Sequence, residues 1–166
     1  MTTTKRKTCF VIMPYGEKKD AEGNPINFDD IFEYIIKPPL EAMKIEVIRG
    51  DKIPNAGSIH REMLHNILNE DLAIVDITTL NPNVFYELGI RHALRRSGTI
   101  LIRKQGTQNP FNIQGMRTIE YDISLSGAKI AIEKLRKSVE AALSSSASDS
   151  LVYDIFPNLK LTLPNE

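Results

Sequence analysis

Residues 71–101 constrain the fold of this chain more than any other stretch. Residues 72–76 are an apolar, β-branched run that ends in an aspartate, and residues 99–102 are a second apolar run. Between them, a polar loop over residues 77–83 precedes a helix predicted over residues 84–96. Two buried strands joined by a helix are typical of a parallel pair with a crossover connection. We therefore expect an α/β fold that binds ligands at the carboxyl edge of its sheet.

The rest of the chain continues the alternation of strands and helices. Apolar runs predict strands over residues 9–13, 45–48 and 118–121. Helical spacing of apolar residues predicts a first helix that Asp29 or Asp30 could cap and that reaches about Lys37. It also predicts helices over residues 58–69, with Ser58 as the N-cap, and over residues 128–143. Pro38 and Pro39 should kink or end the first of these helices near Lys37, and residues 40–43 should continue it for about a turn. The order of elements indicates a parallel sheet with helices on both faces.

The domain boundaries follow from the same pattern. We expect a disordered N-terminus over residues 1–8, one α/β domain over residues 9–143, and a flexible linker and tail over residues 144–166. Residues 16–27 are predicted to be a mobile loop, and residues 103–117 a long loop of the kind that often carries function.

Composition excludes several classes of function. Lys plus Arg and Asp plus Glu both number 21, so no overall positive charge attracts nucleic acid or an anionic membrane. No apolar run approaches the roughly 20 residues of a membrane span. Cys9 is the single cysteine and is expected to be inert, and the N-terminus does not resemble a signal peptide. We expect a cytoplasmic protein.

Two carboxylates are candidates for a catalytic site. Asp76 ends a predicted strand, and Glu87 lies in about the first turn of the following helix, so both should face the same edge of the sheet. Each also has a simpler interpretation, because Asp76 could cap the turn that follows it and Glu87 could be a solvated helix residue. The sequence alone leaves these alternatives open.

Motifs for common cofactors and nucleophiles are absent from the sequence. It contains neither GxGxxG nor GxxxxGK[ST], so a dinucleotide fingerprint and a P-loop are both excluded. There is no GxSxG serine and no HExxH metal motif, and His60 and His65 are spaced to lie on different faces of a helix. We therefore expect no metal and no cofactor.

The string DITTLNPNVFYELGIRHAL, together with CFVIMPYG near the N-terminus and VIRGD after the second strand, resembles the nucleoside 2-deoxyribosyltransferase superfamily and the related TIR-like domains. The resemblance covers most of residues 9–122. It implies a flavodoxin-like sheet of five strands. It also implies that the glutamate of the ELG motif, Glu87 here, attacks the anomeric carbon of a nucleoside. TIR-type NAD hydrolases place a catalytic glutamate on the comparable helix.

The resemblance and the chemistry together assign roles to other residues. An ionised Glu87 would trap the oxocarbenium character that builds on the sugar, while Asp76, Asp51 and Asn83 would hydrogen-bond ribose hydroxyls. Tyr15 would stack on the base, and the backbone after Pro14 would meet sugar or phosphate. Gly89 should let the helix approach the sheet closely. The predicted catalytic residues are Glu87 and Asp76, and the predicted substrate-binding residues are Pro14, Tyr15, Gly16, Arg49, Asp51 and Asn83.

The leading hypothesis is an N-glycosidase or N-(deoxy)ribosyltransferase-like enzyme that acts on a nucleoside, a nucleotide or NAD. The alternative is a TIR-like module that binds a nucleotide or signals without turnover. The resemblance also implies a homo-oligomer, with residues 103–117 and the C-terminal tail as the segments to examine.

Overall fold

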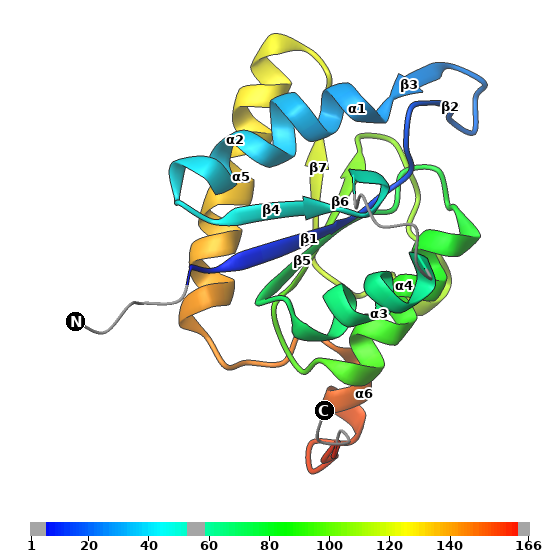
Figure 1. The fold of residues 1–166 in the computed structure, drawn as a ribbon. Coiled ribbons are helices and arrows are strands. Elements are labelled where there is room, and N and C mark those ends of the chain that lie inside the picture. The colour runs from blue at the N-terminus through cyan, green and yellow to red at the C-terminus, as the bar shows by residue number, and fades with distance from the viewer. Residues whose placement is uncertain (1–5, 53–58, 163–166) are drawn as a thin grey trace.

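A parallel five-stranded sheet forms the centre of the molecule. The structure is a computed structural model that describes residues 6–52 and 59–162. The strands lie in the order β4 (Glu46–Arg49), β1 (Thr8–Ile12), β5 (Leu72–Asp76), β6 (Thr99–Lys104) and β7 (Thr118–Tyr121), all parallel to their neighbours. Helices cover both faces (Figure 1). The predicted flavodoxin-like α/β fold is therefore confirmed.

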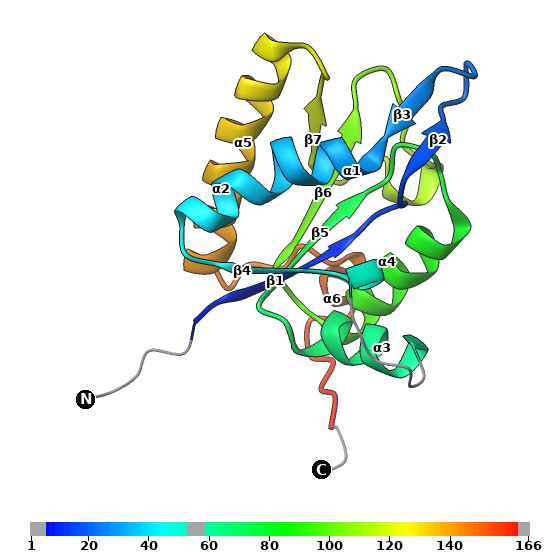
Figure 2. The ribbon, with the colours of Figure 1, turned by 45° about the horizontal axis from the view of Figure 1, so that its top comes forward.

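The helices divide into two groups, one on each face. Helices α1 (Phe28–Ile31), α2 (Lys37–Ala42) and α5 (Leu125–Ser144) lie on one face, and helices α3 (Ile59–Asn69) and α4 (Pro82–Leu94) lie on the other (Figure 2). The chain leaves β1 toward β4 and then returns across β1 to β5. The connections therefore diverge at the carboxyl ends of β1 and β5, which is the usual place for a ligand in such sheets.

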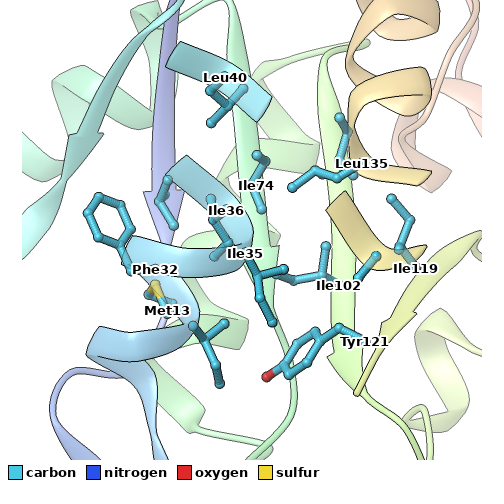
Figure 3. Packing of buried hydrophobic residues seen from close by; sticks show 14 of the residues in the cluster. Met13, Phe32, Ile35, Ile36, Leu40, Ile74, Ile102, Ile119, Tyr121 and Leu135 are labelled. Atoms are coloured by element: carbon cyan, nitrogen blue, oxygen red, sulfur yellow. The ribbon is translucent and has the colours of Figure 1, made fainter. Parts of the chain in front are cut away.

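Two apolar cores hold these layers together. Alternate residues of β5 supply each core: Leu72 and Ile74 pack under α5, and Ala73 and Val75 pack under α4. Because both faces of the strand are buried, all of its residues are apolar until Asp76. In Figure 3, isoleucines and leucines of the helices meet Ile74 and Ile102 of the sheet.

The helical stretch from Phe28 to Ala42 contains an irregular turn. Asn27, rather than Asp29 or Asp30, caps its start, since its side chain accepts hydrogen bonds from both of their backbone N–H groups. Residues Phe32–Ile36 form a wide π-helical turn, which ends where the N–H of Lys37 bonds to the carbonyl of Phe32. The helix does not end near Lys37 but continues through the prolines as α2, in agreement with the continuation predicted over residues 40–43. The prolines supply no N–H, and the wider turn accommodates that loss.

Three segments differ from the predicted loops and termini. Residues 16–27 were expected to be a loop, but β2 (Glu17–Lys19) and β3 (Pro25–Asn27) pair as an antiparallel hairpin. The predicted linker is bound to the domain, because the Asp149 carboxylate accepts from the N–H groups of Gly98 and Thr99 at 2.6 and 2.9 Å. A short helix, α6 (Leu151–Ile155), follows it.

At the N-terminus, Lys7 Nζ and the Thr8 N–H both bond to the Asp71 carboxylate, so residues 7 and 8 are held rather than frayed. The predicted cap Ser58 lies outside the described residues. None of the helices formed by residues 6–52 and 59–162 is long and apolar enough to cross a bilayer.

Arg91 joins the carboxyl end of α3 to the amino ends of β5 and β6. Its side chain is fully buried and donates to the backbone carbonyls of Ile67, Glu70, Asp71 and Gly98, and to the hydroxyl of Thr99. A buried guanidinium needs such partners. Arg91 thereby fixes α4 relative to α3, β5 and β6, and so helps to set the position of Glu87 one turn earlier.

Candidate functional site

The carboxyl ends of β1 and β4 bring together most of the residues that the sequence predicts to bind substrate. Pro14, Tyr15 and Gly16 follow β1, Arg49 ends β4, and Asp51 lies in the short 3-10 turn after it (Gly50–Lys52). Helix α4 also lies near this region, because Glu87 on α4 is close enough to Tyr15 for its charge to raise the pKa of the phenol. Because carboxyl ends of parallel strands meet at one edge, loops far apart in sequence become neighbours here.

Arg49 is the centre of this group. Its side chain is only 3% exposed, and its Nε and Nη2 bond to the two carboxylate oxygens of Asp51 at 2.6 and 2.5 Å. Nη2 also lies 2.8 Å from Asp29 Oδ1. The rings of Phe32 and Tyr15 lie 4.7 and 5.3 Å from the guanidinium carbon. Burial opposes the charge, but Asp51 and Asp29 outweigh it and raise the pKa of Arg49, so the cation is fixed between two rings and two carboxylates.

Tyr15 links Arg49 to Glu87. Its side chain is 39% exposed, and its hydroxyl accepts a hydrogen bond from the backbone of Asp51. Burial, followed by the charges of Glu87 and Asp51, raises the pKa of Tyr15 to about 12. A methyl group at Gly50 would lie 2.6 Å from the Tyr15 hydroxyl, so only glycine leaves room for the ring at this position. The phenol therefore stays protonated, with a partly open ring beside a carboxylate.

Glu87 is partly buried and lies in the second turn of α4, not in its first turn as predicted. It is therefore beyond the N–H groups that would stabilise a negative charge at the helix start. Burial raises the pKa of Glu87 to about 7, and no hydrogen bond from a described residue counteracts this rise. The expected ionised form of Glu87 is therefore the main form only above about pH 7. The carboxyl group changes its charge around pH 7.

Asp76 lies in a separate network, away from solvent. It is 1% exposed, and its carboxylate accepts from the N–H and hydroxyl of Thr78 at 2.9 and 2.5 Å and from the hydroxyl of Tyr121 at 2.8 Å. Burial raises the pKa of Asp76 to about 6, although these hydrogen bonds partly offset the rise. The structure therefore matches the simpler interpretation of Asp76 as a residue that organises the turn after β5. Direct contact between Asp76 and a substrate stays a prediction.

The remaining predicted residues differ in how far they are buried and in what they contact. Pro14 is buried, while Gly16 adopts a left-handed φ of +64° and donates its N–H to Asp29 at 3.3 Å. Asn83 is exposed, one turn before Glu87 on the same face of α4. Gly89 differs from expectation: it is exposed, and a Cβ there would meet nothing within 4 Å, so it does not serve close packing on the sheet.

Sequence reasoning missed three residues of the site. Asp29 and Phe32 contact Arg49, and Tyr121 donates a hydrogen bond to Asp76. From the sequence, Asp29 was interpreted only as a possible helix cap and Phe32 only as part of the apolar face of that helix. Tyr121 was interpreted only as the end of a strand. A cavity of about 500 Å³ lies elsewhere, between α5, the start of β6 and the C-terminal segment, and none of the predicted site residues lines it. Within residues 6–52 and 59–162, no cluster of three or more His, Cys, Asp or Glu side chains could hold a metal ion.

Comparisons with known proteins do not identify the chain. No model of a known protein family matches it. No curated protein matches it either. The site must therefore be interpreted from its own geometry.

Proposed function

We propose that this protein cleaves the N-glycosidic bond of a nucleoside, a nucleotide or NAD, with Glu87 as the nucleophile. The observation that carries the proposal is the state of Glu87: a partly buried carboxyl group without a hydrogen-bond donor among the described residues, beside the half-open ring of Tyr15. Holding an unpaired carboxyl group partly out of water costs folding energy. Such a cost is typical of functional sites. The likeness of residues 9–122 to nucleoside 2-deoxyribosyltransferases and TIR-like domains agrees with this role.

The proposed chemistry begins with the ionised form of Glu87. The carboxylate attacks C1 of the sugar while the bond between C1 and the base nitrogen breaks, and the base leaves with the bonding electrons and takes up a proton. Water then attacks C1 and releases the sugar, or a second base attacks and completes a transfer. Because the carboxylate is poorly solvated, it loses little hydration when it reacts.

The surrounding residues would orient the substrate. Arg49 holds Asp51 by two hydrogen bonds and packs against Tyr15, so the positions of both residues are set before a ligand binds. The exposed part of the Tyr15 ring offers a flat face to a base, and Asp51 and Asn83 offer polar groups to sugar hydroxyls. Such preorganisation lowers the entropic cost of binding and of reaction.

The test is release of a free base. Purified protein is incubated with 2′-deoxynucleosides, their 5′-monophosphates and NAD, and adenine, other bases or nicotinamide are measured by chromatography. We expect release by the native protein and its loss in Glu87→Gln, which keeps the size of the side chain. The matched control is Glu46→Gln, an exposed glutamate on β4. No release from any of these compounds, or equal release by Glu87→Gln, would overturn the proposal.

A binding module without turnover is the second candidate, and the pKa of Glu87 near 7 favours it. A raised pKa favours the protonated, non-nucleophilic form of Glu87, which can donate a hydrogen bond to a ligand instead. Calorimetric binding of a nucleotide without base release, at pH 8 as well as at pH 7, would support this candidate.

We also propose that the protein forms a homo-oligomer. Phe111 in the 103–117 loop is 88% exposed, and Ile155 and Phe156 after α6 are 69% and 60% exposed. Exposed apolar side chains that gather on one surface are typical of contacts between protein chains. Light scattering of the native protein, compared with Phe111→Ser and with Phe156→Ser, would show whether either segment contributes to association.

A further inference from the structure

The β2–β3 hairpin begins and ends at the candidate site. Gly16 leads into it from Tyr15, and its carbonyl accepts the N–H of Phe28 at 3.0 Å, where the hairpin returns to α1. The Gly16 N–H bonds to Asp29, which also pairs with Arg49. The base of the hairpin is thus part of the Arg49 network.

The tip of the hairpin reaches a different strand. Asp20 Oδ2 lies 2.8 Å from Lys104 Nζ at the end of β6, and the Asp20 and Lys104 side chains are 7% and 24% exposed. Since β5 lies between β1 and β6, the hairpin passes over the carboxyl end of β5 on its way. Figure 2 shows it beyond the carboxyl ends of the strands.

Lys104, which pairs with Asp20 at the hairpin tip, is bonded to the Asp76 network. The Lys104 N–H donates to Thr78 Oγ1 at 2.9 Å, and the same hydroxyl contacts Asp76 and Tyr121. This arrangement fixes the strand end that carries the Lys104 ammonium. The Asp20 side chain is also held in place, because its Oδ1 accepts hydrogen bonds from the N–H groups of Glu22 and Asn24 in the hairpin turn.

Little else attaches the hairpin to the domain. Within residues 17–27 every side chain is exposed except those of Asp20 and Ile26, and Ile26 is 3% exposed in the main core. Ile26 lies close to the base at Phe28, so the tip depends on the ion pair. A segment with so few buried contacts is of the kind that opens locally.

We propose that the hairpin of residues 17–27 is a lid over the carboxyl edge of the sheet, latched by the Asp20–Lys104 ion pair and hinged at Gly16 and Ile26. In the latched state the tip lies on β6. In the open state the ion pair is broken, the turn of the hairpin remains intact, and the edge beside Tyr15 is more accessible. The proposal concerns the motion of the hairpin and holds whichever ligand binds.

The test uses a spin label at the tip. Ala21→Cys places a reactive thiol on an exposed residue next to Asp20, while the native Cys9 is buried and burial raises its pKa to about 12, which protects it from labelling. Paramagnetic broadening of the amides of residues 103–105 then reports how often the tip lies on β6. Lys104→Met and Asp20→Asn each remove the attraction, and Asn keeps an acceptor for the hairpin turn. Lys137→Met, an exposed lysine paired with Glu133, is the control.

We expect strong broadening in the labelled native sequence and in the Lys137→Met control. Each latch variant should shift the ratio of latched to open molecules by roughly 5- to 30-fold, with clear loss of broadening and with lower order parameters for residues 18–25. No broadening in the native sequence, or the same broadening in both latch variants, would overturn the proposal. If Lys104→Met fails to fold, Asp20→Asn decides the result alone.

Discussion

Replacing Glu87 by glutamine is expected to stabilise the fold while it removes activity. The structure holds the carboxyl group partly out of water without a described hydrogen-bond donor, and burial raises its pKa from 4.5 to about 7. Each pKa unit corresponds to about 1.4 kcal/mol, which sets a ceiling of about 3 kcal/mol. Because the side chain is partly exposed, solvent screening reduces the expected gain to about 1–2 kcal/mol.

The sign of the effect depends on pH. Between pH 4.5 and about 7, the folded protein binds the proton of Glu87 more tightly than the unfolded chain does, so the native free energy of unfolding falls as pH rises through this window. Glutamine has no charge to desolvate. The gain from Glu87→Gln should therefore be close to zero below pH 4.5 and complete above about pH 7.

Urea unfolding at about pH 4.5 and pH 8 measures the difference directly. The matched control Glu46→Gln alters an exposed glutamate and should shift the midpoint by the same small amount at both values. If Glu87→Gln were equally stable or less stable than the native protein at pH 8, Glu87 would have a favourable partner in the folded state. Desolvation would then not be what raises the pKa of Glu87.

Three further outcomes are expected. The kcat/KM for base release should fall about tenfold per pH unit below pH 7, because the reaction needs ionised Glu87, and a flat profile down to pH 5 would contradict this. Arg91→Met should lower the free energy of unfolding by about 3–5 kcal/mol in chemical denaturation, because four backbone carbonyls lose their buried donor. A loss below about 1 kcal/mol would show that water replaces the guanidinium. Tyr121→Phe should cost about 1–3 kcal/mol in the same assay, because it removes the phenol that donates to Asp76. A neutral result would show that Thr78 alone satisfies the carboxylate.

Much of the fold was accessible from the sequence because burial on both faces of a parallel strand leaves a continuous apolar run. The strand at Leu72–Asp76 has the predicted limits for this reason. The strand at Thr118–Tyr121 also has its predicted limits, although it lies at the edge of the sheet and buries only alternate residues. The hairpin at residues 17–27 was missed because it has only one buried apolar residue, Ile26, and so shows no alternation of apolar and polar residues. The position of its tip on β6 depends on a long-range contact with Lys104 that no local pattern contains.

The candidate site could be predicted only in part, for a related reason. Strand ends identified Tyr15, Arg49 and Asp51 because the carboxyl edge of a parallel sheet gathers them. Whether a carboxylate at that edge faces outward or inward depends on packing. Asp76 turns inward because Tyr121, 45 residues away, offers it a hydroxyl group. The sequence also gave no measure of the desolvation of Glu87, which decides its charge near pH 7.

The most direct test of the central claim is to trap Glu87 during catalysis. In a 2′-fluoro-2′-deoxynucleoside that carries a base with good leaving-group character, the fluorine slows both steps by destabilising oxocarbenium character, while the leaving group speeds the first step. A covalent sugar adduct should therefore accumulate. Mass spectrometry of the intact protein and of its peptides should find one added sugar on Glu87, absent from Glu87→Gln and present in Glu46→Gln. Release of the base with the protein mass unchanged, or a sugar on another residue, would contradict the account.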